Sequence, residues 1–345
     1  MNEAVNAPQI PPHVQLQQMV MAGWMSKAIS VAAKLGLPDM VAMQPQTVGE
    51  LAVQTRTHVE SLNRVLRALA SVGIFEQDES GRYALGAVGQ TLRSDVPGSI
   101  RGVSILLGDD SHWRAWGELE YSVRTGLPAF DHTFGSDFFT YCAGQPETLK
   151  TFQDGMTSLS ESIHAAIVQC YDFSGIDTIM DVGGGYGTLL ATILKANPHM
   201  KGVLFDLPHV VEGAPEVLER WGVADRCEIV GGDFFAHGTL PQGVDACIMS
   251  TVIHDWDDER AQKILRNCHD ATREGGNVLL GEMVVPDGPE PSPAKFCDLN
   301  MLVMTPGGRE RTQAEYGALL QSCGYELSRV VPTFSPVSVV EGFRQ

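Results

Sequence analysis

The stretch 178–188, TIMDVGGGYGT, constrains the fold of this chain more than any other. A short apolar run leads into three consecutive glycines that begin at Gly183, and apolar residues then recur at helical spacing up to Pro198. This pattern predicts a buried strand, a tight turn and a helix. Glycine suits such a turn because the backbone needs unusual dihedral angles and a ligand can approach with no Cβ in the way. Dinucleotide and phosphate sites use similar turns, so the stretch alone does not identify the ligand.

Three further apolar runs each end in polar residues. Residues 202–205 are followed by Asp206, residues 227–230 by the sequence GGDFF, and residues 245–250 by a short segment that contains His254. In open α/β sheets, ligands bind outside the carboxyl ends of the strands, and an acidic residue at the tip of the second strand meets ribose hydroxyls. The sequence therefore predicts a ligand site along one edge of a sheet.

Strands and helices continue to alternate after His254. The apolar patterns predict a strand over residues 276–285 that contains Glu282, helices over 257–273, 295–304 and 312–322, and two closing strands within 327–344. Strands that alternate with helices predict an α/β fold with a doubly wound, mostly parallel, Rossmann-like sheet. We expect this catalytic domain to span residues 171–345.

Residues 13–105 are expected to form a separate, mainly helical domain. Thr47 and Glu50 have the spacing of a helix-capping box, a second helix is predicted over residues 58–72, and a hairpin within 74–85 follows. This is the pattern of a winged helix, which suits either DNA binding or protein packing. The net charge of −18 argues against nucleic acid as a partner, because affinity for nucleic acid depends on cationic contacts with phosphate. We therefore expect a packing and dimerisation unit.

Three other segments complete the predicted organisation. Residues 14–35 form a predicted helix that is apolar on most sides and must be covered, either within the core or by a second copy of the chain. Residues 106–170 are predicted to be a helical linker, rich in aromatic side chains that lie mostly in the core. Residues 1–12 are polar and contain proline, so we expect disorder there.

The cysteines and the apolar runs indicate where the protein acts. The seven cysteines are scattered, with no Cys-x-x-Cys pair, and no signal-peptide pattern precedes them, which favours the reducing cytoplasm. No apolar run reaches the length of a membrane-spanning helix, so no membrane association is expected.

Six motifs follow one another in the second half of the chain: DVGGGYG (181–187), FDLPHV (205–210), GGDFF (231–235), IHDWDDE (253–259), GEMVVP (281–286) and PGGRERT (306–312). Together they resemble the S-adenosylmethionine-dependent O-methyltransferases of the plant caffeate and bacterial natural-product type; the first half matches this family only in character. The resemblance implies a class I methyltransferase fold behind a winged-helix dimerisation domain, in a homodimer with intertwined N-terminal helices. It also implies methyl transfer from S-adenosylmethionine, with S-adenosylhomocysteine as product, to a hydroxyl of a small-molecule secondary metabolite.

The resemblance also assigns cofactor contacts to the strand ends. They are Gly183, Gly185, Asp206, Leu207, Asp233, Phe234 and Ser250. The two glycines are expected to line the methionine moiety, Asp206 to bind the ribose diol, and the Asp233–Phe234 pair to hold adenine. Ser250 stands where plant members carry a lysine, which leaves the contact with the cofactor carboxylate open.

His254 is the candidate general base. It follows an apolar strand end, where a polar residue is best explained by a functional role, and an imidazole with an ordinary pKa of about 6.5 accepts a proton near neutral pH. The alternative is a structural histidine held by hydrogen bonds. The resemblance makes Glu282 the carboxylate that orients His254, and Glu310 a second carboxylate at the histidine. For Glu310 the alternative is a solvated charge in a loop.

No metal is expected, because the acidic run Asp255, Asp257 and Asp258 is better explained as the cap and first turn of the following helix. The acceptor is expected to be a small aromatic or phenolic molecule, in a pocket partly walled by the linker region. The candidates for acceptor contact are His112, Trp113, Phe152, Met156, Asp298 and Met301. The alternative for the four aromatic, histidine and methionine residues of the linker region is a place in the core, and Asp298 alternatively contacts His254.

Three functions remain open at this point. The first is methyl transfer to a hydroxyl, with N- or C-methyl transfer as its variant. The second is a cofactor-binding relative that catalyses hydroxylation or rearrangement. The third is a winged-helix regulator that senses a small molecule. The presence of both His254 and Glu282 favours the first, and the negative charge of the chain disfavours the third.

Overall fold

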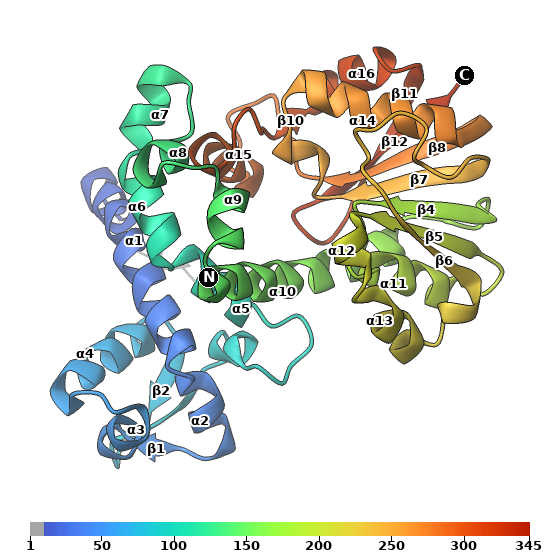
Figure 1. Cartoon of the computed structure of the whole chain (residues 1–345). Coiled ribbons are helices and arrows are strands. Elements are labelled where there is room, and N and C mark those ends of the chain that lie inside the picture. The colour runs from blue at the N-terminus through green and yellow to red at the C-terminus, as the bar shows by residue number, and fades with distance from the viewer. Residues whose placement is uncertain (1–9) are drawn as a thin grey trace, which may run out of the picture. The chain divides into compact units, whose positions relative to one another are not determined.

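The computed structural model describes residues 10–345 (Figure 1). Contacts within the chain divide it into two compact units: unit 1 is Met1–Trp113 with Lys150–Ser158, and unit 2 is Arg114–Leu149 with Leu159–Gln345. The segment 1–12 predicted to be disordered lies largely outside the described residues, and helix α1 already begins at Pro12. The region predicted as a linker contributes to both units, and the division of the chain into 1–12, 13–105, 106–170 and 171–345 stays a prediction.

Unit 1 combines helices with a small sheet. The predicted capping box is present, because the Thr47 side chain accepts the Glu50 N–H and the Glu50 carboxylate accepts the Thr47 N–H. The predicted hairpin forms from β2 and β3, and β1 joins it as a third antiparallel strand. The elements are α1 (Pro12–Lys34), α2 (Leu37–Met43), β1 (Gln46–Thr47), α3 (Val48–Thr55), α4 (Val59–Ala70), β2 (Phe75–Gln77), β3 (Arg82–Leu85), the 3-10 helix η1 (Gly89–Leu92) and α5 (Arg101–Leu107), and both units share α6 (Asp110–Gly117) and α10 (Pro146–Cys170).

The core of unit 1 confirms the winged-helix pattern. Leu51 of α3, Leu62 and Leu66 of α4, and Phe75 and Tyr83 of the hairpin are buried in one cluster. Helix, turn, helix and hairpin thus share a single apolar core, as the spacing of apolar residues predicts. Burial of both helices and the hairpin against one another explains why this short segment forms a separate unit.

Unit 2 contains a seven-stranded sheet in the order β11-β12-β8-β7-β4-β5-β6. All neighbouring pairs from β8 to β6 are parallel, whereas β12 is antiparallel to β8 and β11 is antiparallel to β12. The predicted mostly parallel sheet is therefore confirmed. The strands are β4 (Thr178–Val182), β5 (Lys201–Asp206), β6 (Cys227–Gly231), β7 (Val244–Ser250), β8 (Thr272–Glu282), β11 (Tyr325–Pro332) and β12 (Ser338–Arg344). The order reverses between β4 and β7, and the carboxyl ends of the parallel strands meet at one edge there.

Helices cover both faces of this sheet, as Figure 1 shows for α11 and α13 on one face and α14 and α16 on the other. Successive residues of a strand point to opposite faces. Ile179 of β4 therefore packs in one core cluster, with α10, α11 and α13, while Met180 packs in the other, with α14 and α16. These helices and their neighbours are α11 (Thr188–Ala196), α12 (Pro208–Val211), α13 (Ala214–Trp221), η2 (Ala224–Arg226), η3 (Ile253–Asp255), α14 (Asp258–Ala271) and α16 (Gln313–Gln321).

The predicted strand over 276–285 divides into two. β8 ends at Glu282, where its pairing with β12 ends, one residue after its pairing with β7. β9 (Val284–Val285) instead pairs in parallel with β10 (Arg311–Thr312). The sequence does not announce this short pair, because each strand is only two residues long. Its consequence is local: the residue before β10, Glu310, comes close to Glu282 at the end of β8.

Four further helices of unit 2 contact one another. They are α7 (Leu119–Thr125), α8 (Ala129–Phe134), α9 (Phe138–Ala143) and α15 (Pro293–Met304). Phe130 is fully buried and packs against Phe134, Phe138 and Tyr141, which confirms that these aromatic residues belong to a core. Trp116 donates a hydrogen bond to Asn300 of α15 at 2.9 Å.

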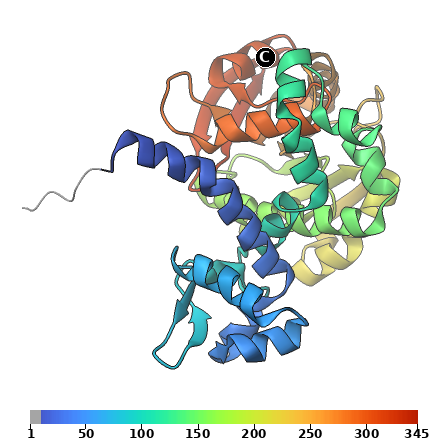
Figure 2. The same cartoon turned by 90° about the vertical axis from the view of Figure 1, so that its left-hand side faces the viewer.

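The first half of α1 extends away from α2, α3 and α4, as both views show (Figures 1 and 2). Its apolar side chains are largely exposed, including Met19 at 69%, Val20 at 73% and Trp24 at 71%. Despite this apolar character, no helix within residues 10–345 has both the length and the composition that crossing a bilayer requires. An exposed apolar stripe of this kind marks an interaction surface.

We predict that this stripe forms the core of a homodimer. Replacing Val20 and Trp24 together by Asp should yield a monomer, because each large apolar side chain that loses its burial forfeits about 1.5–3 kcal/mol. Light scattering at micromolar concentration measures the mass. Met43→Asp is the control, because Met43 is 88% exposed at the end of α2 and belongs to a different surface. A double variant that remains dimeric would place the interface elsewhere.

Candidate active site

The glycine turn after β4 has the backbone that the sequence predicts. Gly183, Gly185 and Gly187 all have positive φ angles, of 74°, 60° and 79°. A Cβ on Gly184 would lie 2.6 Å from the carboxylate of Asp181, so a side chain does not fit there. At Gly185 a Cβ would meet no described atom within 4 Å. The turn is therefore closely packed beneath and open at Gly185, as a ligand cradle requires.

Asp206, at the end of β5, closes one side of this cradle. Its Oδ2 accepts the Gly185 N–H at 2.8 Å, and its Oδ1 accepts the Leu207 N–H at 2.6 Å. The carboxylate is half-buried, and each oxygen keeps a lone pair for a second donor. A carboxylate fixed in this way presents two acceptors side by side, which fits a pair of vicinal hydroxyls.

Beneath the turn lies a buried acid that sequence reasoning missed. Asp181 is 1% exposed, and burial, followed by the nearby charge of Asp206, raises the pKa of Asp181 to about 7. Burial and the neighbouring carboxylate therefore disfavour a negative charge on Asp181 beneath the turn.

The ends of β6 and β7 complete this edge. Phe234 lies close to the glycine turn, since a Cβ on Gly183 would be 3.6 Å from its ring, and it packs edge-on against Phe235. The exposed Asp233 accepts the Phe235 N–H at 2.8 Å, which fixes this short loop. The Ser250 Oγ is buried and has no hydrogen-bond partner among residues 10–345. An aromatic wall, a carboxylate and an unpaired hydroxyl fit the adenine, ribose and amino-acid parts of S-adenosylmethionine.

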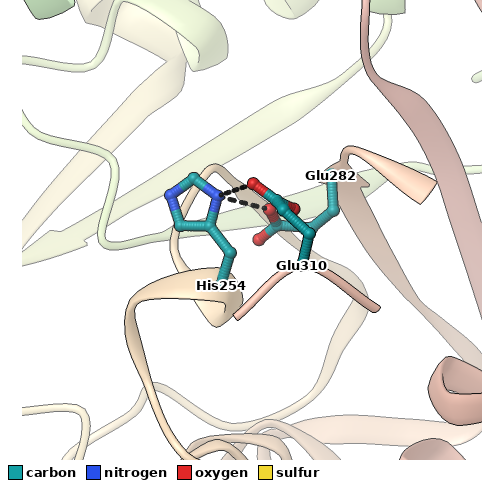
Figure 3. A group of neighbouring side chains, drawn as sticks. All are labelled: His254, Glu282 and Glu310. Carbon is teal, nitrogen blue, oxygen red and sulfur yellow. Dashed lines mark hydrogen bonds and ion pairs between the residues drawn. The ribbon is translucent and has the colours of Figure 1, made fainter. Parts of the chain in front are cut away.

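His254 lies beside two buried carboxylates (Figure 3). Its Nδ1 is 3.0 Å from Glu310 Oε1, within hydrogen-bond distance, and 3.5 Å from Glu282 Oε2. Both glutamates are buried, with exposed fractions of 2% or less. The second ring nitrogen, Nε2, points away from both of them in Figure 3 and lies 3.6 Å from Asp255 Oδ1.

The two glutamates differ in what they hold. Glu282 Oε1 accepts the N–H groups of Val252 and Ile253 at 3.0 and 2.8 Å, so this carboxylate anchors the backbone in front of the histidine. Glu310, rather than Glu282, lies within hydrogen-bond distance of the imidazole. The backbone reaches this position through Thr251, whose φ of 53° is unusual for a β-branched residue and costs about 1–3 kcal/mol.

The carboxylates change the proton affinity of the cluster. Burial by itself lowers the pKa of His254, but the negative charges of Glu282, Asp255 and Glu310 outweigh burial and raise that pKa to about 10. Burial also raises the pKa of Glu282, to about 7, against the opposing charge of His254. The free protein therefore holds the imidazole in its charged form at neutral pH. The pKa of His254 differs in this from the ordinary value near 6.5 expected from the sequence.

The same three residues are the candidates for holding a metal. One ligand atom from each of His254, Glu282 and Glu310 lies within 4.8 Å of the others. The sequence had drawn attention instead to the acidic run that begins at Asp255. There Asp257 caps α14 by accepting the Arg260 N–H at 2.8 Å, as expected.

The predicted acceptor contacts fall in both units. Asp298 and Met301 lie on α15 of unit 2, and Asp298 accepts the Glu310 N–H at 2.9 Å, so it supports the glutamate at the histidine. The others belong to unit 1: His112 is buried, Trp113 is partly exposed, and Phe152 and Met156 are half-buried on α10. Their contact with an acceptor stays a prediction.

The fold and this edge of polar groups define a class I methyltransferase. The O-methyltransferase domain model matches residues 116–326, and the O-methyltransferase dimerisation domain model matches residues 18–95. The chain therefore belongs to the O-methyltransferase family with an N-terminal dimerisation domain, and S-adenosylmethionine is its cofactor.

Three similar proteins illustrate this family. Phenazine O-methyltransferase PhzM of Lysobacter antibioticus is 41% identical, and the match covers 99% of each chain. The O-methyltransferase NcsB1 of neocarzinostatin biosynthesis, solved with S-adenosylmethionine and 2-hydroxy-5-methyl naphthoic acid, is 34% identical with a TM-score of 0.76, over 93% of this chain and 96% of that one. The N,N-8-amino-8-demethyl-D-riboflavin dimethyltransferase RosA of Streptomyces davawensis is 29% identical with a TM-score of 0.83, over 97% of this chain and 100% of that one.

We predict that Asp206 carries much of the cofactor affinity. Asp206→Ala should weaken S-adenosylmethionine binding at least about tenfold, because a charge-assisted hydrogen bond contributes about 1.5–3 kcal/mol. Calorimetric titration measures the affinity. Asp225→Ala, which removes an exposed acid from the same unit, should leave it unchanged. Equal affinities in both variants would remove Asp206 from the cofactor site.

Proposed function

We propose that this enzyme methylates a phenolic hydroxyl of a small aromatic natural product, with His254 as general base. The observation that carries this proposal is the buried imidazole that lies 3.0 Å from Glu310 and 3.5 Å from Glu282, directly after the strand that ends at Ser250. A buried ionisable cluster next to a cofactor edge is the arrangement that proton removal needs.

The tautomer of His254 follows from its neighbours. With Nδ1 donating its proton to Glu310, Nε2 of the neutral ring carries the free lone pair and accepts the proton of the acceptor hydroxyl. The imidazolium that results faces two buried carboxylates, which stabilise its charge. S-adenosylmethionine, when bound, supplies an electrophilic methyl group with its own leaving group. The chain itself must therefore hold the cofactor, orient the acceptor and remove the acceptor proton. The site at Asp206 holds the cofactor, and His254 removes the proton.

The relatives support an aromatic acceptor. PhzM is named for a phenazine and NcsB1 was solved with a hydroxylated naphthoic acid, so two family members act on or bind planar aromatic molecules. For this chain we propose that Asp298 and Met301 of unit 2 contact the acceptor. Contact of His112, Trp113, Phe152 and Met156 of unit 1 with the acceptor is a separate prediction. The seven free cysteines favour the reducing cytoplasm as the place of the reaction.

An amine is the second candidate acceptor, because the name of RosA describes methylation of an amino group. The same base serves either atom, so the cluster alone does not distinguish them. Mass spectrometry of the product detects the added methyl group, and the ¹³C chemical shift of that methyl group separates an ether from an N-methyl group. Gain of one oxygen instead of one methyl would identify the non-methylating alternative.

We predict that His254 is required for turnover and not for cofactor binding. With a phenol of pKa near 10, His254→Ala should lower kcat by about two to four orders of magnitude, because a positioned base contributes that much. Calorimetry should find cofactor affinity nearly unchanged. His199→Ala is the matched control, since His199 is exposed in the same unit. Near-normal turnover of His254→Ala on such a phenol would contradict the acid–base mechanism.

A pH profile gives an independent prediction. Because the neighbouring carboxylates raise the pKa of His254, the neutral base forms only as pH rises, and kcat should still increase above pH 7. Glu310→Gln removes one of these negative charges, so it should move the rise in kcat to lower pH while it reduces the maximal rate. Glu282→Gln should act in the same direction. The variants leave the pKa of the phenol untouched, so an unshifted profile would exclude the imidazole as its source.

A further inference from the structure

Arg311 is a buried cation that touches the segment carrying His254. Its side chain is 1% exposed, and its guanidinium donates hydrogen bonds in three directions. Nη1 bonds the Ile253 carbonyl oxygen at 3.2 Å, and Nη2 bonds the Trp256 carbonyl oxygen at 2.9 Å. Nε and Nη2 both bond Asp258 Oδ1, at 3.1 and 2.8 Å. The planar fork thus spans the backbone before and after the histidine.

A second contact joins the loop before β10 to the segment that carries His254. The Arg309 N–H donates to the His254 carbonyl oxygen at 2.8 Å. A Cβ on Gly308 would lie 2.8 Å from that same oxygen and 3.1 Å from the Asp255 carbonyl oxygen, so only glycine permits this approach. The loop that leads into β10 is therefore packed directly on the backbone of the candidate base.

Glu310 and Arg311 are neighbours in this loop and act on the same target from different directions. Glu310 meets the His254 ring, while Arg311 binds the backbone on both sides of that ring. Consecutive residues of an extended segment point to opposite sides, which allows one strand to present both groups. The pairing of β10 with β9 fixes this strand beside the end of β8.

A role limited to capping α14 does not account for Arg311. The cap of that helix is already Asp257, which accepts the Arg260 N–H at 2.8 Å. Asp258 is 57% exposed and provides the counter-charge that makes burial of the guanidinium tolerable. The two carbonyl contacts serve neither purpose, since they fall on Ile253, the first residue of η3, and on Trp256, the residue that caps it, on either side of His254.

We propose that Arg311 is a positioning residue for the reaction, which holds residues 253–258 so that the His254 ring meets Glu310 and directs its other nitrogen outward. This inference rests on the proposed role of His254 as base. An Arg is suited to this task because its rigid fork binds several acceptors at once, whereas the ammonium of Lys is a point charge on a flexible stem. Misplacement of a reacting group by about 1 Å can cost about 100-fold in rate.

The test compares Arg311→Lys and Asp258→Asn with Glu259→Gln, a matched loss of one exposed charge in the first turn of α14. Circular dichroism and thermal unfolding report folding, calorimetry reports S-adenosylmethionine affinity, and steady-state kinetics separate kcat from KM. NMR of ¹⁵N-histidine-labelled protein reports the Nδ1 proton of His254, assigned by its loss in His254→Ala. Asp258→Asn guards against misfolding, because its side chain is half-exposed and leaves the two carbonyl contacts intact.

We expect Arg311→Lys to lose about 10–100-fold in kcat and to broaden or lose the Nδ1 proton signal. Its circular dichroism and thermal unfolding should match those of the parent, and its cofactor affinity should stay within twofold. Asp258→Asn should show a smaller loss of the same kind, and Glu259→Gln none. An unchanged kcat and Nδ1 signal in Arg311→Lys overturns the proposal. So does a loss of kcat that follows a proportional loss of folding or cofactor affinity. If His254→Ala keeps its activity, the proposed function fails, but loss of the Nδ1 signal in Arg311→Lys still supports the positioning role.

Discussion

The site depends on one imidazole shared between two buried carboxylates. Neither Glu282 nor Glu310 has access to bulk water, so their negative charges would be costly without a cation or a set of donors. His254 supplies the cation, and the N–H groups of Val252 and Ile253 supply donors to Glu282. The same interaction raises the pKa of His254, because the negative charges of the carboxylates stabilise the protonated ring.

His254, Glu282 and Glu310 come from distant parts of the chain, so the fold must bring them together. β7 and β8 are parallel neighbours, so their carboxyl ends place His254 and Glu282 at one edge. Glu310 arrives by another route, through a loop fixed by the β9–β10 pair and by its own N–H bond to Asp298. The unusual backbone of Thr251 fits this picture, because strain is tolerated where the surrounding contacts fix a functional geometry.

The sequence predicted the sheet and the cofactor edge because both follow from local patterns. Apolar periodicity marks each strand, and the glycine turn and Asp206 lie about twenty residues apart within consecutive strand–helix units. The arrangement around His254 was harder to predict. Which glutamate meets the ring, and how far the pKa of His254 moves, depend on contacts between residues 28 and 56 positions apart in sequence. The buried Arg311 was missed for the same reason: nothing in PGGRERT distinguishes a buried cation from an exposed one.

In the proposed mechanism, the raised pKa of His254 also bears on which acceptors depend on it as a base. Proton transfer is most effective when the pKa of the base is close to that of the group it deprotonates. An imidazole with a pKa of about 10 matches an ordinary phenol, whose pKa is also about 10, better than an unperturbed histidine does. The cost is that less of the enzyme holds the neutral ring at pH 7. A strongly acidic hydroxyl is already ionised at that pH and needs no base, so the proposed mechanism predicts that turnover of a weakly acidic phenol depends on His254 more than turnover of an acidic one.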